Sequence, residues 1–238
     1  MTPQDLFRLH SFFGALTDGE TRELLKRAVT KRFAPGEVVF HQDDPGDGLY
    51  GVLTGSILIV VESLEGKELI LNMHGPGEFF GEVALLDGEG RSAAAVAREA
   101  SQLFFLGRSE FLAFLRQRPE AMIRIIAFLC GRLRRATNLV EDSAFLNVPS
   151  RLAKQLIALI DGNGPRDADA TLQISQSELA RMLGVSREMV SKQLAIWREA
   201  GIVELGRRRL IVRDERALEQ LIAGGQRLPR AERDGSKP

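Results

Sequence analysis

The stretch GEFFGEVALLDGEGRSAAAVA, residues 77–97, decides the fold, and its polar residues indicate what it can bind. Gly81 lacks a side chain, so backbone N–H groups beside it can approach an anion closely. Arg91 offers a planar, charged fork that suits phosphate oxygens, and Ser92 with the amides near Ala93 adds neutral donors. Because Glu82 would repel a phosphate, its position favours a neighbouring hydroxyl donor. The stretch therefore predicts a pocket for a compact molecule with both a phosphate and a free sugar hydroxyl, as in a cyclic nucleotide.

Short runs of strand-forming residues lie on both sides of this stretch, from Phe33 to Leu106. Glycine and proline pairs separate these runs, and Glu65-Gly66-Lys67 is predicted to be the tip of a hairpin. Many short strands at close intervals predict an antiparallel, jelly-roll-like β-roll. The runs include Ser56–Val61 and Leu69–Leu71, and the breaks include Pro35-Gly36, Pro45-Gly46 and Gly75-Pro76-Gly77.

Helical periodicity flanks the predicted roll. Residues 5–30 carry short helical patterns, Glu110–Arg116 predicts a short helix ended near Pro119, and a longer helix is predicted from about Glu120 to Asn147. A helix of about 27 residues reaches about 40 Å and needs a partner for its apolar side, most simply a second copy related by a twofold axis. Packing on its own roll could account for the first half. The predicted seam is Met122, Ile125, Ile126, Leu129, Leu133, Ala136 and Val140, with Arg132, Arg134 and Arg135 on its solvated flank.

A second domain is predicted after the long helix. Asn147-Val148-Pro149 is the predicted hinge, because proline and the residue before it disfavour a continued helix. Ser150–Ile160 predicts a capped helix, which is ended by a polar loop at Asp161–Pro165. Leu172–Ile174 then predicts one strand of a winged-helix domain.

The segment from Gln176 to Ala195 has the pattern of a helix-turn-helix. Ser175 is predicted to cap the first helix, Gly184 to supply the turn, and Ser186 to cap the second helix, Arg187–Trp197. The second helix of such a motif enters the DNA major groove with its N-terminal residues against base edges. Gly201–Leu205 and Arg209–Val212 predict a wing hairpin with Gly206-Arg207-Arg208 at its tip.

Polar residues on the predicted second helix suit the reading of base pairs. Arginine can read guanine, glutamate can accept from the cytosine amino group, and lysine can reach guanine acceptors. Arginines at the wing tip suit phosphate contacts. A winged helix used for protein contacts is the alternative. The predicted DNA-facing residues are Ser175, Gln176, Ser186, Arg187, Glu188, Ser191, Lys192, Arg207 and Arg208.

Both motifs resemble those of the cAMP receptor protein/FNR superfamily of transcription regulators. Residues 77–97 are similar to the phosphate-binding cassette of cyclic-nucleotide-binding domains, FGE-x-A-L followed after a short gap by R-x-A. The pattern S-x-x-E-L-A-x-x-L-G-V-S-R-E-x-V is similar to the helix-turn-helix of these regulators. The resemblance covers roughly residues 10–215, and it implies a DNA-binding homodimer that works with RNA polymerase.

The resemblance also assigns roles to individual residues. It implies that Glu82 binds the ribose 2′-hydroxyl and that Arg91 and Ser92 bind the cyclic phosphate. It implies that Arg187, Glu188 and Lys192 read the half-site, where Lys192 departs from the commoner arginine. The ligand-binding residues predicted in this way are Gly81, Glu82, Val83, Ala84, Arg91, Ser92, Ala93 and Thr137.

The base of the cyclic nucleotide is less well indicated. In members that bind cAMP, the long helix supplies a threonine and, from the other subunit, a serine to the adenine. Alignment through Ala144–Ala153 places Ala136 at the threonine position and Thr137 at the serine position. A slip of one residue would restore the threonine. The phosphate and sugar are therefore predicted, and the base stays open.

Composition and charge agree with a two-domain regulator. The chain has 238 residues, 44% of them hydrophobic, and no apolar run of membrane-spanning length, and its first residues lack the features of a signal peptide. A soluble, cytoplasmic protein is predicted. Residues 148–238 hold 16 Lys and Arg against 12 Asp and Glu, which leaves 16 against 20 for residues 1–147. The basic end suits attraction to phosphates.

Cysteine and histidine usage excludes several kinds of site. The single cysteine, Cys130, can form neither an internal disulfide nor a four-cysteine iron–sulfur cluster, and its apolar neighbours predict a core or interface position. His10, His41 and His74 lack metal-ligand spacing. One haem-binding branch of the family uses a histidine near His74, but the intact Gly81-Glu82 argues against haem. No nucleophile–base pair or triphosphate-binding loop is present, so neither an enzyme nor a cofactor is predicted.

These observations predict an α+β protein with an N-terminal antiparallel β-roll and flanking helices, a long dimerisation helix and a C-terminal winged helix-turn-helix. The predicted parts are a sensor domain at 1–119, the dimerisation helix at 120–147, the DNA-binding domain at 148–223 and a disordered tail at 224–238. The predicted function is regulation of transcription from an inverted-repeat operator in double-stranded DNA, controlled by a cyclic nucleotide, with cAMP preferred. The alternatives are another effector such as a cyclic dinucleotide, no effector, or a ligand-binding protein-docking module.

Overall fold

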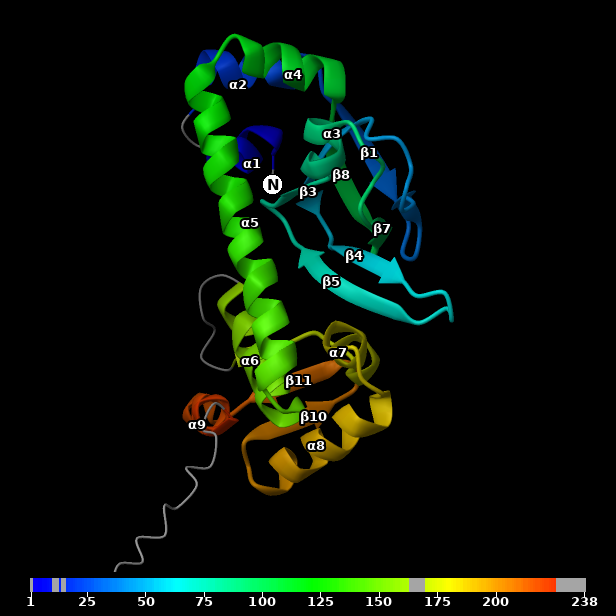
Figure 1. Cartoon of the computed structure of the whole chain (residues 1–238), viewed down its shortest axis with the longest axis vertical. Coiled ribbons are helices and arrows are strands. Elements are labelled where there is room, and N and C mark those ends of the chain that lie inside the picture. Colours follow the sequence, from blue (N-terminus) through cyan, green and yellow to red (C-terminus); the bar gives the residue numbers. More distant parts are fainter. Residues whose placement is uncertain (1, 10–12, 14–15, 163–169, 226–238) are drawn as a thin grey trace, which may run out of the picture. The chain divides into compact units, whose positions relative to one another are not determined.

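The computed structural model describes residues 2–9, 13, 16–162 and 170–225 (Figure 1). His10, part of the predicted helical region at 5–30, the end of the predicted loop at 161–165 and most of the predicted tail lie outside the described residues. The chain divides into two compact units, Met1–Arg134 and Arg135–Pro238. The first contains two antiparallel sheets with helices, and the second contains a helix-turn-helix with a small sheet, so the predicted fold class is confirmed.

Two four-stranded sheets form the β-roll of the first unit. One has the order β1-β8-β3-β6 and the other has the order β2-β7-β4-β5, and all neighbouring strands are antiparallel. The predicted tip Glu65-Gly66-Lys67 joins β4 and β5. The strands are β1 (Val29–Phe33), β2 (Val38–Phe40), β3 (Gly48–Thr54), β4 (Ile57–Glu62), β5 (Glu68–His74), β6 (Phe79–Phe80), β7 (Ala94–Ala97) and β8 (Ser101–Gly107).

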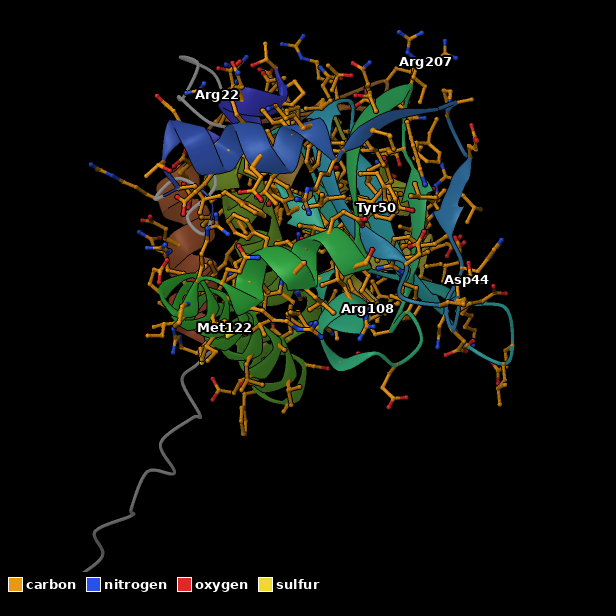
Figure 2. All side chains as sticks on the ribbon, turned by 90° about the horizontal axis from the view of Figure 1, so that it is seen from above. Arg22, Asp44, Tyr50, Arg108, Met122 and Arg207 are labelled. Atoms are coloured by element: carbon orange, nitrogen blue, oxygen red, sulfur yellow. The ribbon has the colours of Figure 1, made fainter. Side chains whose placement is uncertain are left out.

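Strand β3 is buried on both faces and organises the core of the roll. Because successive side chains of a strand point to opposite faces, Leu49 and Leu53 join the cluster that contains the helices, while Tyr50 and Val52 pack between the sheets. In Figure 2, Tyr50 lies among the strands, whereas Asp44 lies on the loop before β3. The helices of this unit are α1 (Pro3–Leu9), α2 (Asp18–Lys26), α3 (Glu82–Asp87) and α4 (Arg108–Arg116), followed by the long α5 (Pro119–Phe145).

A partly buried arginine, Arg118, joins α2 to the turn between α4 and α5. The Nε of Arg118 donates to Glu20 at 2.7 Å, and its second amino group donates to Glu23 at 3.2 Å. The guanidinium also lies 4.1 Å from the centre of the Phe114 ring. Glu20 is at the same time the third residue of α2 and accepts from the backbone N–H of Thr17, which caps the helix. One carboxylate thus fixes both the start of α2 and its contact with α4.

Helix α5 has two different apolar faces, one packed on the roll and one exposed. The predicted seam combined residues from both faces. Ile125 and Leu129 pack into the core of the roll, so they are not part of an outward seam. The exposed face has its own spacing of three and four residues and includes Cys130, which was predicted at a core or interface position. Among the described residues, neither α5 nor any other helix is long and apolar enough to cross a membrane. The outward seam consists of Ile123, Ile126, Cys130, Leu133, Thr137 and Val140.

The second unit packs its helices around a three-stranded sheet of order β10-β11-β9. The strand predicted at Leu172–Ile174 lies two residues earlier, at Ala170–Leu172. The elements are α6 (Val148–Gly162), β9 (Ala170–Leu172), α7 (Gln176–Leu183), α8 (Arg187–Glu199), β10 (Val203–Gly206), β11 (Arg209–Val212) and α9 (Glu215–Gly225). Helix α9 therefore includes the first two residues of the predicted tail.

The predicted hinge is shorter than expected. Only Leu146 and Asn147 separate α5 from α6, and Pro149 lies inside the first turn of α6. The side chain of Asn147 accepts from the backbone N–H of Ser150 at 3.0 Å, so Asn147 caps the helix that was predicted to begin at Ser150. Proline has no N–H group, and the N–H groups in the first turn of a helix have no acceptor within the helix, so Pro149 fits there without loss of a hydrogen bond. The prediction that Pro149 would lie before the helix was therefore wrong.

Replacing Glu20 with glutamine should reduce the loss of stability in acid. Hydrogen bonds from the Thr17 backbone and from Arg118 lower the pKa of Glu20 to about 2. The folded-state pKa lies below the usual 4.5, so ionised Glu20 stabilises the fold above that pH, and this contribution is lost as the pH falls towards about 2. Melting temperatures across this range should fall less steeply for Glu20→Gln than for the wild type.

The control is Glu65→Gln, which removes an exposed ion pair with Lys67 and should change little. Equal acid sensitivity of the wild type and Glu20→Gln would contradict the role of the Arg118 cluster.

Candidate functional site

Gly81 connects strand β6 to helix α3, and two features require a glycine there. Its φ of 83° lies in the left-handed region, which other residues rarely adopt. A Cβ at this position would also lie 2.6 Å from an amino nitrogen of Arg91. The residue therefore allows both the sharp turn and the close approach of the Arg91 guanidinium to the backbone.

Arg91 is held rigidly inside the roll, where it is only 1% exposed. One amino group donates to the carbonyl of Gly81 at 2.7 Å, and the other donates to the carbonyl of Gly48 at 2.9 Å and to the carboxylate of Asp47. The guanidinium also lies 4.2 Å from the centre of the Phe40 ring. Among the described residues, its Nε is buried and has no hydrogen-bond partner. A fixed positive charge is thus present beside the turn at Gly81.

Glu82, the first residue of α3, is 5% exposed. Its carboxylate lies 2.6 Å from an amino nitrogen of Arg132 on α5. Within the described part of the chain, neither carboxylate oxygen has a hydrogen-bond partner. Glu82 therefore has a charge partner but keeps its capacity to accept from a hydroxyl group.

The position of Arg132 corrects the sequence analysis, which assigned it to the solvated flank of the long helix. Besides pairing with Glu82, it donates to the carbonyl of Phe79 at 3.1 Å and lies 5.1 Å from the centre of the Phe128 ring. Glu82 and Arg132 are fifty positions apart, so no local spacing could have indicated the pair. The expectation that a buried carboxylate needs a cation was the only available signal.

The other predicted ligand-binding residues differ in exposure. Ser92 is exposed in the turn after Arg91, and Val83 is partly exposed on α3. Ala84 and Ala93 are buried beside them. Thr137 lies on the exposed seam of α5, in the second compact unit. The structure thus brings Gly81 and Arg91 together and places Glu82 beside them, although Glu82 pairs with Arg132 rather than with Arg91.

His74 is a buried neighbour of this cluster that the sequence analysis considered only as a haem ligand. Its ring stacks on Phe80 with centroids 5.6 Å apart, and its Nε2 lies 3.3 Å from the amide nitrogen of Asn72. Its Nδ1 lies 3.7 Å from the carboxylate of Glu78. Burial works to raise the pKa of Glu78, but the contact with His74, the hydrogen bond from the Gly75 backbone and the charge of Arg132 together hold this pKa below its usual value. The histidine therefore stabilises the turn that leads to Gly81.

The helix-turn-helix has the caps and turn that the sequence predicted. Ser175 and Glu178 form a reciprocal capping box at the start of α7, which occupies the Ser175 hydroxyl. Gly184 ends α7 with a φ of 64°, and Ser186 caps α8 by accepting from the N–H of Met189. The two helices are therefore fixed at both ends of the turn.

Helix α8 buries one side and exposes the residues predicted to read DNA. Val190, Leu194 and Trp197 face the core, while Arg187, Glu188 and Lys192 are exposed and Ser191 is half-buried. Hydrogen bonds from its own backbone N–H and from Ser186 lower the pKa of Glu188. The carboxylate is therefore ionised at neutral pH and acts as an acceptor.

The wing tip presents two exposed arginines on a tight turn. Gly206 and Arg209 form the last pair of β10 and β11, and Arg207 and Arg208 connect them. Arg208 has a φ of 55°, a left-handed conformation that is unfavourable for a residue with a side chain. Its amino group lies 3.8 Å from the carboxylate of Glu178.

Comparison with known proteins agrees with this geometry. A family model of the cyclic nucleotide-binding domain matches residues 30–118, and a model of the Crp-like helix-turn-helix domain matches residues 150–221. The cyclic AMP receptor protein of Thermus thermophilus is 36% identical over 213 residues, which cover 89% of this chain and 96% of that protein. This chain belongs to the cAMP receptor protein/FNR family. It is a cyclic-nucleotide-binding transcription regulator of that family, which is not a class of enzymes.

Two further relatives respond to different effectors. A CRP-like cAMP-activated global transcriptional regulator of Mycobacterium tuberculosis is 32% identical over 80% of this chain and 89% of that protein. Among solved structures, the c-di-GMP responsive global regulator CLP of Xanthomonas campestris is 26% identical, with a TM-score of 0.72 over 82% of this chain and 99% of that chain. Membership of this family therefore leaves the identity of the effector open.

Gly81→Ala should destabilise the protein more than Gly36→Ala. Both glycines have a φ near 80°, so both variants should lose about 1 kcal/mol from the left-handed backbone. A Cβ at Gly36 meets nothing within 4 Å, whereas a Cβ at Gly81 would displace Arg91. Urea denaturation measures the two free energies of unfolding, and equal losses would show that Arg91 is not held against the Gly81 backbone.

Proposed function

We propose that this chain is a homodimeric regulator whose affinity for an inverted-repeat DNA site is controlled by a cyclic nucleotide, preferably cAMP, bound at the turn between β6 and α3. The observation that carries this proposal is the buried Glu82 carboxylate, which has no hydrogen-bond partner among the described residues and directly follows Gly81, whose carbonyl accepts from the fixed Arg91. A ribose hydroxyl would supply the donor to Glu82 while a cyclic phosphate would accept from Arg91 and Ser92.

The rigid setting of Arg91 supports phosphate binding. Its contacts with the carbonyls of Gly81 and Gly48 and with Asp47 orient the guanidinium before a ligand arrives. Such preorganisation reduces the entropy lost on binding. In this proposal the phosphate shares the Arg91 charge with Asp47, and the exposed Ser92 adds a neutral donor.

The preference for cAMP rests on the two relatives named for it and on Thr137. The threonine lies on the outward seam of α5, where a second subunit would approach, so it is suited to contact a base across the dimer. Ala136 lacks the hydroxyl that cAMP-binding relatives carry at that position, and CLP is c-di-GMP responsive, which makes a cyclic dinucleotide the second candidate. A regulator without an effector would leave Glu82 with Arg132 as its charge partner and with no hydroxyl to accept from.

Arg91→Ala should weaken binding of cAMP by about 2–4 kcal/mol, because it removes a buried, charge-assisted contact. Glu82→Ala should also weaken binding of cAMP, but it should change little for 2′-deoxy-cAMP, which lacks the hydroxyl that Glu82 accepts from. Titration calorimetry with cAMP, cGMP and c-di-GMP gives the affinities. Equal affinity of the wild type and Arg91→Ala for all three ligands would refute the proposed site.

The outward seam of α5 supports a dimer. Six residues with alternating steps of three and four form it over more than two heptads, from Ile123 to Val140, and four of them are exposed aliphatic side chains. That spacing is the one that a second helix of the same kind can bury. A second copy of this chain is therefore the proposed occupant, with the seams of the two α5 helices in contact.

Wild-type protein should have a light-scattering mass of about twice 26.3 kDa, and Leu133→Glu should reduce it to one chain because the charge would lie in the seam. Leu64→Glu is the control, since Leu64 is fully exposed at the tip between β4 and β5 and should leave the dimer intact. A short bismaleimide should link two copies through Cys130 alone. A wild-type mass of one chain would refute the dimer.

The exposed residues of α8 and the wing support recognition of DNA bases and backbone respectively. A twofold dimer requires an inverted repeat with half-sites about one helical turn apart. We propose that Glu188 accepts from a cytosine amino group and that Arg207 and Arg208 contact phosphates, while RNA polymerase is the partner on bound DNA.

Changing the base pair read by Glu188 should cost about 1–3 kcal/mol, and Glu188→Ala should largely remove this discrimination. Arg208→Gly should weaken binding to all sequences and reduce the salt slope by about one unit, as one lost phosphate contact does, without loss of stability because glycine tolerates the backbone conformation. Selection from random DNA supplies the site. Failure to enrich any palindrome with any of the cyclic nucleotides would favour the protein-docking alternative.

A further inference from the structure

Helix α8 exposes apolar side chains next to its polar residues. Met189 is 48% exposed and Ile196 is 51% exposed, although the opposite side of the helix buries Val190, Leu194 and Trp197 in the core. Neither exposed residue is needed for that core. Met189 and Ile196 are two turns apart and lie on the same flank of the helix.

The place of Met189 is fixed by the start of the helix. Its N–H donates to the Ser186 cap at 3.3 Å, so it is the third residue of α8, directly after Glu188 and about one turn before Lys192. The N-terminal turn of a recognition helix is the part that reaches base edges. Ile196 lies about 10 Å further along the axis, in the second half of the helix.

Charge indicates what covers Met189. Lys192 lies about one turn from it on the helix, Arg187 lies two residues before it on a different side, and the exposed Arg207 and Arg208 belong to the wing of the same unit. A polyanion satisfies these cations better than an apolar protein groove does, because the groove would leave them desolvated. The apolar group that a polyanionic duplex presents in its major groove is the C5-methyl of thymine.

We propose that Met189 determines specificity for a thymine in each half-site by packing against its C5-methyl group. The unbranched, polarisable side chain can adapt to a methyl group at the groove surface. This inference rests on the proposed binding of DNA by α8, and it adds a position that hydrogen-bonding residues cannot read.

The test uses the operator selected from random DNA and the full-length protein with its effector. Each thymine of a half-site is replaced in turn by deoxyuridine, which removes only the methyl group. Wild-type affinity should fall about fourfold at one thymine per half-site, the factor that corresponds to burial of one methyl group. Met189→Ala should show no loss at that thymine but should still discriminate the base pair read by Glu188. The control Ile196→Ala should keep the wild-type pattern.

The outcomes separate this inference from the proposed function. Selected DNA that binds with equal affinity whichever thymine is replaced, or a half-site without thymine, overturns the role of Met189 while DNA binding stands. A Met189→Ala protein that keeps the fourfold loss also overturns it. Failure of the wild type to bind any selected DNA overturns the proposed function together with this inference.

Discussion

The ion pair between Glu82 and Arg132 is the contact on which the sensor unit depends. A carboxylate that is 5% exposed needs a cation, and the cation comes from the long helix rather than from the roll. Removing Arg132 would leave the buried Glu82 carboxylate without its charge partner, which is destabilising. The pair therefore ties α3, at the proposed effector site, to α5. Arg132 also binds strand β6, because it donates a hydrogen bond to the carbonyl of Phe79.

This arrangement offers a physical route from ligand to helix. In the proposed mechanism, a hydroxyl that donates to Glu82 would change the electrostatic environment of Arg132 and would so favour some positions of α5 over others. A ligand shifts such an equilibrium only by its different affinities for the two states. Within the described part of the chain, Arg91 has no such contact with α5. The carbonyls of Gly81 and Gly48, the Asp47 carboxylate and the Phe40 ring hold it inside the roll. In the proposed mechanism Arg91 supplies affinity and the Glu82–Arg132 pair supplies the response.

Local sequence patterns predicted the parts of the fold that local physics controls. The capping residues Ser175 and Ser186, the turn at Gly184 and the hairpin at Glu65–Lys67 follow from backbone preferences of a few residues, and each has the expected structure. The cassette was visible because Gly81, Glu82 and Arg91 are close in the chain. The role of Arg132 was missed because the contact joins residues fifty positions apart.

The same limit explains the error in the α5 seam. Periodicity shows that a helix has apolar faces, but it does not show which face meets the body of its own unit. Ile125 and Leu129 pack against the roll, whereas the face with Cys130 and Leu133 is exposed. Pro149 gave a similar error, since proline both ends one helix and begins the next.

The most direct test of the account is a reciprocal binding measurement on the wild-type protein. The affinity for the selected operator is measured with and without saturating cyclic nucleotide, and the affinity for the nucleotide is measured with and without operator. Linkage requires both affinities to rise by the same factor, about 5- to 150-fold for typical allosteric coupling. Operator affinity that is unchanged by every cyclic nucleotide that binds would contradict the claim that the cassette controls DNA binding.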